Sequence, residues 1–545
     1  MNVSQPARLT AIATAVLLLI LCCAVNFALQ STLPPEPLGD SAPLNQFSAG
    51  RAMRTVRHIA AEPHPTGSQA NIEVRDYLIN ELKSLGLTPE VQSALVMQQA
   101  KQSILQNRQV GGIHNVLAKL PGKQTGKALL LVAHYDSVPA GSGAADDAAS
   151  VAAILETLRA IKTQAALHND VICLFTDGEE SGLLGANAFV RQHPWAKDVG
   201  LVLNFEYRGN SGAFMMFETS FGNGKLIEGL AAAVPAIQAN SLMFEVYNRM
   251  PNDTDFTVFK QAGFSGMNFA AIDGFAAYHT ELDRPEAINQ GTLQHEGDIM
   301  LGLVKHFGNQ SLDNLKAENR VYFDLPGFGI VHYPQSWITA MLLLPLIIYI
   351  CICVKSIKTK AMRLRSLMAV AISYPLLIGM LYGINYGVLK GIQLVHTDKP
   401  NTFINDLFFI GLMLIDSAVM GSIVLVCRKW LTSQELCLGI AACWLIMNGL
   451  LCLIPGATFL TFWPILAVLL SYLCISLSNI NGRNVNQKWL YAVGALPVLI
   501  LYAPIIKNLY IALTFTSAAI ILVPFCFAAG MFAPVLIEFR RSRSL

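Results

Sequence analysis

The sequence has little charge and almost no cysteine outside its apolar stretches. Only 14% of the 545 residues are charged, against roughly 25% in typical soluble domains. Ten of the 11 cysteines lie within apolar stretches or at their ends, and the remaining one, Cys173, has no partner for a disulfide. A disulfide framework is therefore excluded for the polar part of the chain, which must rely on its core or on a bound metal. The net charge of +2 gives no indication of nucleic-acid binding.

Hydrophobic residues make up 53% of the chain and are unevenly placed. Residues 32–336 have the mixed composition of a soluble domain, whereas residues 337–545 are a series of apolar stretches with short polar breaks. Residues 1–31 contain an apolar run that is longer than the core of most signal peptides. We therefore favour an uncleaved N-terminal transmembrane anchor over a cleaved signal, followed by a soluble domain and a C-terminal bundle of about seven transmembrane helices.

The bundle and its loops predict a membrane topology. At about 20 residues a span, we expect spans at about 337–354, 366–389, 403–427, 435–454, 457–478, 489–506 and 509–537. With the N-terminus in the cytoplasm, the inner side carries thirteen Lys and Arg residues and the short outer loops carry three. The positive-inside rule then places residues 32–336 outside the cytoplasm. The compact length and the disulfide-free domain favour a bacterial inner membrane with a periplasmic site, and a vacuolar or endoplasmic reticulum membrane would have the same topology.

One ionisable residue, Asp416, lies near the middle of the third C-terminal span. An ionisable group at that depth is a functional-site hypothesis by default. The alternative is a hydrogen bond between helices, for example to Asn448.

The soluble part alternates between strand and helix patterns. The stretches "ALLLVAHYDS", "DVICLFTD" and "VGLVLNFE" are typical of buried strands, and "DDAASVAAILETLRAI" and "GLLGANAFVRQH" are typical of helices. This alternation predicts an α/β domain with a mostly parallel sheet. In such sheets, sites form outside the carboxyl ends of the strands.

Polar residues gather at those predicted strand ends. His134 and Asp136 are two residues apart, which on a strand turns both side chains the same way. This spacing suits a metal ligand with a carboxylate partner, and a hydrogen-bonded pair in the core would explain it equally well. Asp146 and Asp147 follow a glycine-rich turn, where one could bridge two metals or either could cap a helix.

Three further carboxylates and a histidine follow the same pattern. The stretch "CLFTDGEESGLLGA" places Glu179 and Glu180 side by side after a strand, Glu206 ends the next strand, and His279 lies in "FAAYHTELD". Two divalent cations would be balanced by three carboxylates and a bridging hydroxide, with two neutral histidines completing the site. Such mixed ligation suits zinc, without excluding manganese or cobalt. The absence of cysteine ligands excludes a structural zinc finger.

The motifs "AHYDS", "GAADDAASVA", "TDGEESGLLGA", "NFEYRG" and "YHTELD" resemble, in order and spacing, those of the zinc-dependent M28 peptidases, the aminopeptidase family. The resemblance covers about residues 48–308 and implies a three-layer α/β/α sandwich with a mixed sheet. The added helices resemble the membrane-bound branch of the family, the vacuolar membrane protease and endoplasmic reticulum metallopeptidase group.

The resemblance also implies roles for individual residues. Two zinc ions would be held by a set of ligands in which His134 and Glu180 bind one ion, Glu206 and His279 bind the other, and Asp146 bridges them. Glu179 would be the general base and Asp136 the partner of the first histidine. Many members have Asp at the position of Glu206, and the membrane-bound branch resembles this sequence in using Glu.

Several neighbouring residues receive weaker predictions. Arg208 could bind a substrate carboxylate or form an ordinary surface pair, and Tyr278 could stabilise an oxyanion. Asp255 in "NDTDF" is typical of a helix cap, and His64 in "PHPTGS" is typical of a structured turn beside the cleft.

The sequence therefore favours a membrane-anchored zinc aminopeptidase that acts on peptides outside the cytoplasm. A carboxypeptidase or dipeptidase of the same fold, a glutaminyl-cyclase-like transferase, and a catalytically inactive ectodomain on a transport or receptor bundle remain as alternatives.

Overall fold

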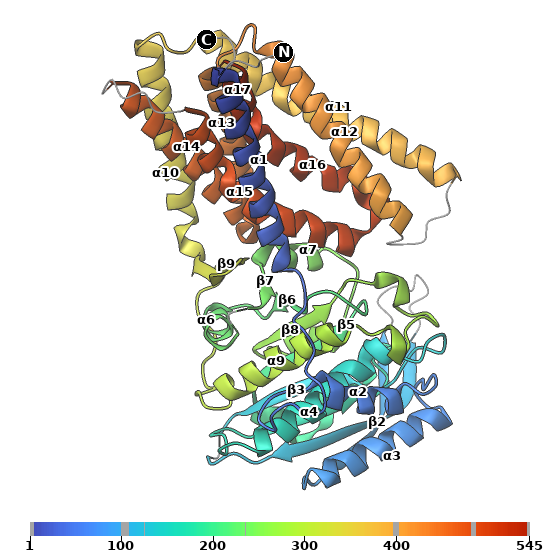
Figure 1. The fold of residues 1–545 in the computed structure, drawn as a ribbon. Helices are drawn as coiled ribbons and strands as arrows, with labels where there is room; N and C mark the ends of the chain where they lie inside the picture. Colours follow the sequence, from blue (N-terminus) through green and yellow to red (C-terminus); the bar gives the residue numbers. More distant parts are fainter. Residues whose placement is uncertain are drawn as a thin grey trace. The chain divides into compact units, whose positions relative to one another are not determined.

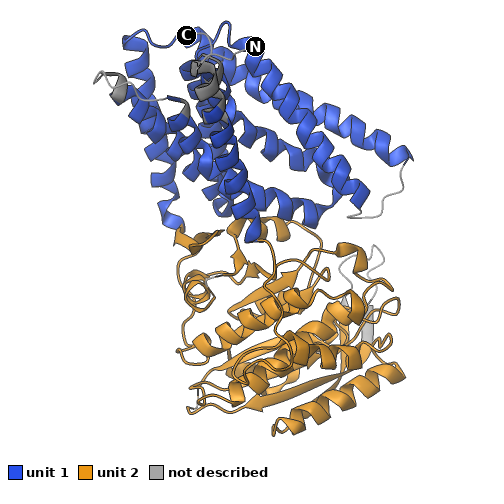
Figure 2. Cartoon of the chain, viewed as in Figure 1, with its two compact units in different colours: residues 1–31, 335–545 blue, residues 32–334 orange. Residues whose placement is uncertain are grey.

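The computed structural model describes residues 5–99, 108–124, 126–234, 236–395, 403–480 and 487–541. Lys399, Arg483 and Arg543, which contribute to the topology prediction, lie outside the described residues. The chain divides into two compact units, one formed by residues 32–334 and the other by residues 1–31 together with 335–545 (Figure 2). The two units are described separately below.

Residues 32–334 are built on one eight-stranded sheet (Figure 1). Its strands are β1 (Glu90–Gln99), β2 (Arg108–Leu120), β3 (Ala128–His134), β4 (Val171–Thr176), β5 (Val199–Tyr207), β6 (Met215–Thr219), β7 (Gln238–Ala239) and β8 (Gly266–Ala271). They follow the order β1-β2-β4-β3-β5-β8-β6-β7. The central strands β4, β3, β5 and β8 are parallel, and β1, β2 and β6 join antiparallel. The expected mixed, mostly parallel sheet is confirmed.

Helices cover both faces of this sheet. Residues of α2 (Ala49–Ile59), α3 (Gln69–Ser84), α4 (Ser150–Lys162), α6 (Gly224–Ala233) and α9 (Gln290–Phe307) share one hydrophobic core. Residues of α5 (Leu184–Gln192) and α8 (Asp255–Gln261) form a second core. In Figure 1, α2, α4 and α9 lie in front of the sheet. The domain is therefore a three-layer sandwich.

Strand β3 shows why the sequence produces two cores. Leu129 and Leu131 belong to the first core, whereas Leu130 and Val132 belong to the second. Alternate side chains of a strand point to opposite faces, so a continuous apolar run can be buried on both sides only in the middle of a sandwich. Because β3 is packed on both faces, it holds the residue at its carboxyl end in a fixed position.

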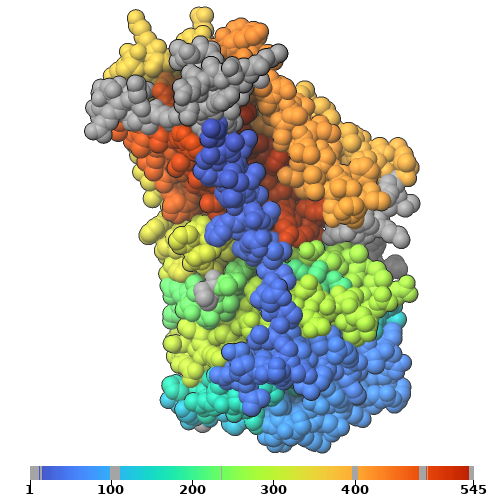
Figure 3. All heavy atoms as spheres, viewed as in Figure 1, coloured from blue at the N-terminus to red at the C-terminus, as the bar shows by residue number. Residues whose placement is uncertain are grey.

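The stretch that leads into α2, residues 32–48, runs along the surface of this unit (Figure 3). The side chain of Gln294 in α9 accepts hydrogen bonds from the backbone N–H of Leu38 and of Ala49, both at 3.0 Å. Ser48 caps α2 by accepting from the N–H of Arg51. A small hairpin, β9 (Arg320–Leu325) and β10 (Gly329–Pro334), closes the unit.

The helical unit contains, within the described residues, seven segments long and apolar enough to cross a membrane. They comprise α10 (Ile338–Lys358) with the turn before it, α11 (Leu364–Val395), α12 (Phe403–Cys427), α13 (Ser433–Leu451), α14 (Phe459–Ile480), α15 (Gln487–Leu513), and α16 (Ala518–Ala529) with most of α17 (Ala533–Arg541). The chain is therefore a multi-pass membrane protein. The N-terminal helix α1 (Gln5–Gln30) packs against α15, and its described apolar part, Ala15–Gln30, is shorter than the seven spans.

Asp416 of α12 is buried in this unit and links three helices. Its Oδ2 accepts a hydrogen bond from Asn385 Nδ2 of α11 at 2.8 Å and lies 3.4 Å from the thiol of Cys526 in α16. A hydrogen bond between helices is therefore present, but the suggested partner is wrong. Asn448 instead donates to the carbonyl of Met341 and accepts from Thr461.

Candidate metal centre

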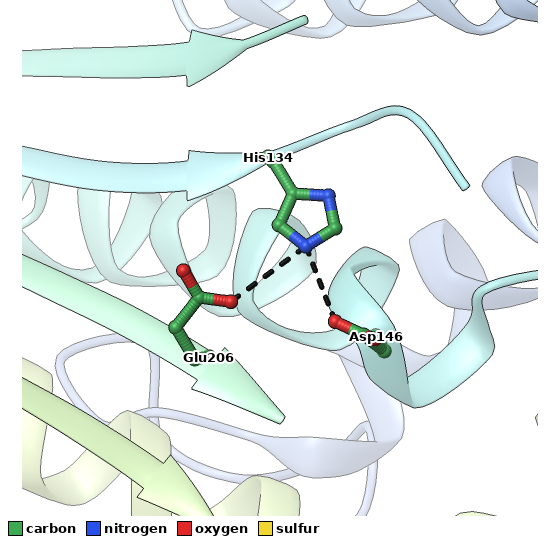
Figure 4. A group of neighbouring side chains, drawn as sticks. All are labelled: His134, Asp146 and Glu206. Carbon is green, nitrogen blue, oxygen red and sulfur yellow. Dashed lines mark hydrogen bonds and ion pairs between the residues drawn. The ribbon is translucent and has the colours of Figure 1, made fainter. Parts of the chain in front are cut away.

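The residues expected to bind metal meet at the carboxyl ends of the central strands. His134 is the last residue of β3, and Glu206 is the penultimate residue of β5. Asp146 lies in the turn that follows β3, Glu180 follows β4, and His279 follows β8. Figure 4 shows His134, Asp146 and Glu206 pointing toward one another from three different segments.

The side chains form two groups that share one carboxylate. His134 Nε2 lies 3.1 Å from Asp146 Oδ1 and 3.6 Å from Glu206 Oε2. His279 Nε2 lies 3.2 Å from Asp146 Oδ2 and 2.9 Å from Glu180 Oε1. Asp146 therefore turns a different oxygen to each group, which is the arrangement of a bridging ligand.

These distances fit a divalent ion. Two ligand atoms about 2.1 Å from a shared tetrahedral ion are about 3.4 Å apart. In addition, Glu180 Oε1 and His279 Nε2 are buried and make no hydrogen bond, although they are 2.9 Å apart. Buried polar atoms normally have a partner, and a cation between the two would supply one.

The shortest contacts pair these residues differently from what the resemblance implied, although Glu180 also shares a candidate metal group with His134. The contacts place Glu206 beside His134 and Glu180 beside His279, and no candidate metal group among the described residues contains both Glu206 and His279. Strand β5 lies directly beside β3 and brings Glu206 to His134, while β4 lies along the other edge of β3. Linear order along the chain could not predict this pairing.

His134 is oriented by the backbone rather than by the carboxylate of Asp136. Strand β3 ends at His134, so the two side chains do not share a strand face. His134 Nδ1 lies 2.9 Å from the carbonyl oxygen of Asp136 and 3.6 Å from its Oδ1. Because a carbonyl can only accept, Nδ1 must donate, which in the neutral ring leaves Nε2 with the lone pair that a metal needs.

The carboxylate of Asp136 supports the loop of the adjacent glutamates instead. Its Oδ1 accepts from the backbone N–H of Glu179 at 3.0 Å, and its Oδ2 lies 3.3 Å from the N–H of Glu180 and 3.1 Å from Thr66 Oγ1. A carboxylate oxygen of Glu179 lies within 4.8 Å of ligand atoms of His134 and Glu180. Asp136 therefore fixes the backbone from which both glutamates project.

The turn carrying Asp146 is held by Asp283, which lies more than 130 residues further along the chain. Asp283 accepts from the N–H of Ala145 at 2.7 Å and from that of Asp146 at 3.1 Å. The capping alternative for the two aspartates is wrong, because α4 begins at Ser150 without a side-chain cap. Asp147 Oδ2 instead accepts from the backbone N–H of His134 at 3.1 Å.

Glu206 is held by a buried amide that sequence reasoning missed. Asn204 Nδ2 donates to Glu206 Oε1 and to Asn268 Oδ1 of β8, both at 3.0 Å. Asn268 Nδ2 in turn donates to Glu218 Oε2 of β6 at 3.1 Å, and Glu218 forms an ion pair with Lys260 of α8. One feature of the sequence could have indicated this contact. Asn204 and Glu206 are two residues apart, which places both side chains on one face of β5.

The concentration of carboxylates strongly perturbs the pKa values at the site. Burial raises the pKa of Glu179 well above its usual range and that of Glu206 to about 8. Burial alone would lower the pKa of His279, but Asp146 and Glu180 outweigh it and raise that pKa to about 9. Without a cation the side chains retain protons, so metal binding is expected to release them.

Other residues singled out in the sequence surround this centre. Asp177 accepts from the N–H of His114 at 2.9 Å and so ties the acidic loop to β2. Asp255 does not cap α8, whose N-cap is Thr254, and it accepts from Thr176 Oγ1 at 2.5 Å. His64 lies in a turn, where its Nδ1 donates to the carbonyl of Glu62 and its N–H to Ser137 Oγ.

Tyr278 and Arg208 lie on one side of the centre. The ring of Tyr278 stacks on that of His279 with centroids 3.7 Å apart and on that of Phe275 at 5.7 Å. The guanidinium carbon of Arg208 lies 4.8 Å from the centroid of Phe275. Burial lowers the pKa of Arg208 and raises that of Tyr278.

The domain is an α/β sandwich in which histidines and carboxylates form two groups at the carboxyl ends of the strands. These two features are typical of the class of metallohydrolase-like α/β domains. Within that class, residues 115–304 match peptidase family M28, and the chain carries a domain of this family.

The chain is similar to an endoplasmic reticulum metallopeptidase and to a vacuolar membrane protease. The chain is 31% identical to human endoplasmic reticulum metallopeptidase 1 over 334 residues, which are 56% of this chain and 36% of the human protein. It is 32% identical to the vacuolar membrane protease of Candida dubliniensis over 283 residues, covering 50% of this chain and 30% of that protein. The matched part therefore spans only about a third of the length of these relatives.

Among solved structures, the chain is similar to an aminopeptidase from Aneurinibacillus sp. strain AM-1. The TM-score is 0.42 at 14% identity, over 49% of this chain and 96% of the aminopeptidase.

Proposed function

We propose that this protein is a membrane-anchored metallopeptidase that uses two zinc ions to remove N-terminal residues from peptides. The observation that carries the proposal is the pair of ligand groups sharing Asp146, with Glu179 beside them. A site with two adjacent ions and a free carboxylate suits hydrolysis of an amide.

The residues would divide into two ligand sets and a base. His134 and Glu206 would hold one ion, Glu180 and His279 the other, and Asp146 both. Bound ions of this kind would lower the pKa of water and polarise the carbonyl group of the scissile bond. The donor set of histidines and carboxylates fits zinc, with manganese and cobalt as alternatives.

Glu179 would be the general base. It accepts the proton of the attacking water and delivers it to the leaving amine, which requires a pKa nearer the operating pH than that of an exposed carboxylate. Its burial provides such a shift. Asp136 holds the Glu179 backbone N–H at 3.0 Å and thereby limits the movement of the base between the two proton transfers.

Tyr278 would act on the substrate carbonyl. Its ring is fixed between those of His279 and Phe275. Burial raises the pKa of its hydroxyl, so the hydroxyl stays protonated and can donate to a developing oxyanion.

The membrane setting follows from the loop charges. With both chain ends in the cytoplasm, the catalytic domain would lie on the opposite side, either in the periplasm of a bacterium or in the lumen of the endoplasmic reticulum or a vacuole. The names of the two curated relatives favour a luminal site.

The proposal is tested by assaying the purified full-length protein on peptides with free, acetylated or amidated ends. Activity should disappear on chelation, return with zinc, and require a free N-terminus. Glu179→Gln should lower kcat by about 10²- to 10⁴-fold with unchanged metal content, whereas Glu36→Gln, an exposed control, should have no effect. A requirement for a free C-terminus would indicate a carboxypeptidase or dipeptidase, and full activity of Glu179→Gln would disprove the mechanism.

A further inference from the structure

Arg208 is a cation that nothing in its surroundings balances. It lies in the loop that follows β5, two residues beyond Glu206, and its own N–H donates to the carbonyl of Ala271 at 2.8 Å. Its side chain is half-buried, and its Nε is fully buried without a hydrogen-bond partner. Within the described part of the chain, no carboxylate lies at ion-pair distance from it.

Another arginine of the same domain shows the usual arrangement. Arg51 is also buried, and its Nε donates to Glu156 at 2.8 Å while the rest of its guanidinium donates to backbone carbonyls. Removing a charge from water without a partner costs free energy that an ion pair partly recovers. Arg208 is half-buried, so water still solvates part of its guanidinium, and the Phe275 ring adds a cation–π contact worth about 0.5–2 kcal/mol, but the buried Nε has no partner.

The ring face connects Arg208 to the metal centre. The guanidinium lies over Phe275, Phe275 stacks on Tyr278, and Tyr278 stacks on His279. The three contacts are 4.8, 5.7 and 3.7 Å long. An extended peptide advances about 3.3–3.6 Å per residue, so the guanidinium lies within about four residues of the centre where a peptide would be cleaved.

We propose that Arg208 binds a carboxylate of the peptide substrate, located within about four residues of the scissile bond. A guanidinium presents two parallel N–H groups that match a carboxylate. The carboxylate would be the free C-terminus of a short peptide or the side chain of an acidic residue. The inference rests on the proposed peptidase function and adds to it a preference for short or acidic peptides.

The test compares three substrates that differ in the presence and position of a carboxylate. They are a Leu-Ala-Ala tripeptide with a free C-terminus, its C-terminal amide, and an amide in which the last alanine is replaced by aspartate. We expect kcat/KM of the full-length, zinc-loaded protein to be about 10- to 100-fold higher for a carboxylate than for the plain amide. A preference for the first substrate alone indicates recognition of the C-terminus, and a preference for the third indicates an acidic side chain.

Variants then attribute the preference to Arg208. Arg208→Gln should abolish it by lowering kcat/KM for the carboxylate substrates while leaving that for the plain amide unchanged, and Arg208→Lys should restore part of it. Arg249→Gln is the matched control, because Arg249 is exposed and pairs with Glu245. If Arg208→Gln lowers activity on all three substrates equally, Arg208 only supports the stack on His279, and the proposal is wrong.

A binding measurement separates this inference from the proposed function. Analogues of the tripeptide and its amide, in which the first peptide bond is reduced to CH₂–NH, cannot be hydrolysed. Calorimetry should show about 10-fold or tighter binding of the acid than of the amide, and no difference with Arg208→Gln. Equal binding of these two analogues and of a third, the amide with aspartate in the last position, to the parent protein would overturn the role of Arg208, even if peptides are cleaved. Selective binding without cleavage would overturn only the peptidase proposal.

Discussion

At the scale of single residues, hydrogen-bond donors and shared metal-ligand groups offset the repulsion among the carboxylates that follow β4. The amides of Glu179 and Glu180 converge on Asp136, and Asp177 accepts from the backbone of β2. Burial raises the pKa of Asp177 to about 6. Asp136 and Asp177 therefore have hydrogen-bond donors of their own, whereas Glu180 Oε1 at the metal centre has none among the described residues.

A buried carboxyl outside the metal centre should make stability depend on pH. Glu296 in α9 is fully buried, its Oε2 accepts from the hydroxyl of Tyr207 at 2.8 Å, and burial raises its pKa to about 8. Because the folded pKa exceeds the unfolded one, its stabilising contribution is complete below about pH 4.5 and is lost as pH rises through 8. The loss between pH 5 and 8 is on the order of 3 kcal/mol.

Glu296→Gln should remove this part of the pH dependence, since the amide oxygen can still accept from Tyr207. The measurement is the thermal unfolding midpoint of the purified protein at pH 5, 6, 7 and 8, with the exposed Glu36→Gln as control. Parallel curves for Glu296→Gln and the parent would show that Glu296 is already ionised in the fold.

At the scale of elements, three strands and a helix are tied together behind the metal centre. The series Asn204, Asn268, Glu218 and Lys260 runs from β5 across β8 to β6 and ends on α8. Glu218 is completely buried, and Lys260 is its only ion-pair partner among the described residues. The series gives Glu206 a fixed donor whose position depends on four separate segments.

Breaking the ion pair at the end of this series should destabilise the domain. Lys260→Met leaves Glu218 buried and uncompensated, and we expect a loss of about 3 kcal/mol in the free energy of unfolding. Glu218→Gln combined with Lys260→Met should recover most of it, because no buried charge remains. Urea unfolding of the four members of this cycle measures the coupling, and additive losses would contradict it.

The sequence predicted the strands β3, β4 and β5 and the helices α4 and α5 from local patterns, and the roles of the candidate ligands at the strand ends stay predictions. It could not predict contacts that depend on sheet order. The pairing of His134 with Glu206 requires β5 to lie beside β3, and the support of Asp146 by Asp283 joins segments more than 130 residues apart. Asn448 was the wrong partner for Asp416 for the same reason, because helix neighbours are set by packing and not by order along the chain.

At the scale of the whole molecule, the chain combines an α/β domain with a unit of apolar helices. The seven apolar segments match the spans expected from the sequence, although α15 continues to Leu513 and the final span begins near Phe515. An odd number of C-terminal spans plus an N-terminal anchor would return both chain ends to one side of the membrane.

This topology predicts where reporters will be active. Alkaline phosphatase, which folds only outside the bacterial cytoplasm, should be active when fused at Gln310 and inactive when fused in the turn after Lys358, between α10 and α11. Expression in a bacterium and activity staining provide the measurement. An inactive fusion at Gln310 together with an active one after Lys358 would reverse the orientation.

The α/β domain is an insertion within the helical unit, which takes up the chain again at residue 335 after leaving it at residue 31. Both ends of the domain are therefore attached to helices. A single proteolytic cut within residues 32–334 would leave each fragment joined to an apolar helix, and shedding of the domain would require two cuts. The domain would thus stay joined to apolar helices even when one of its exposed loops is cut.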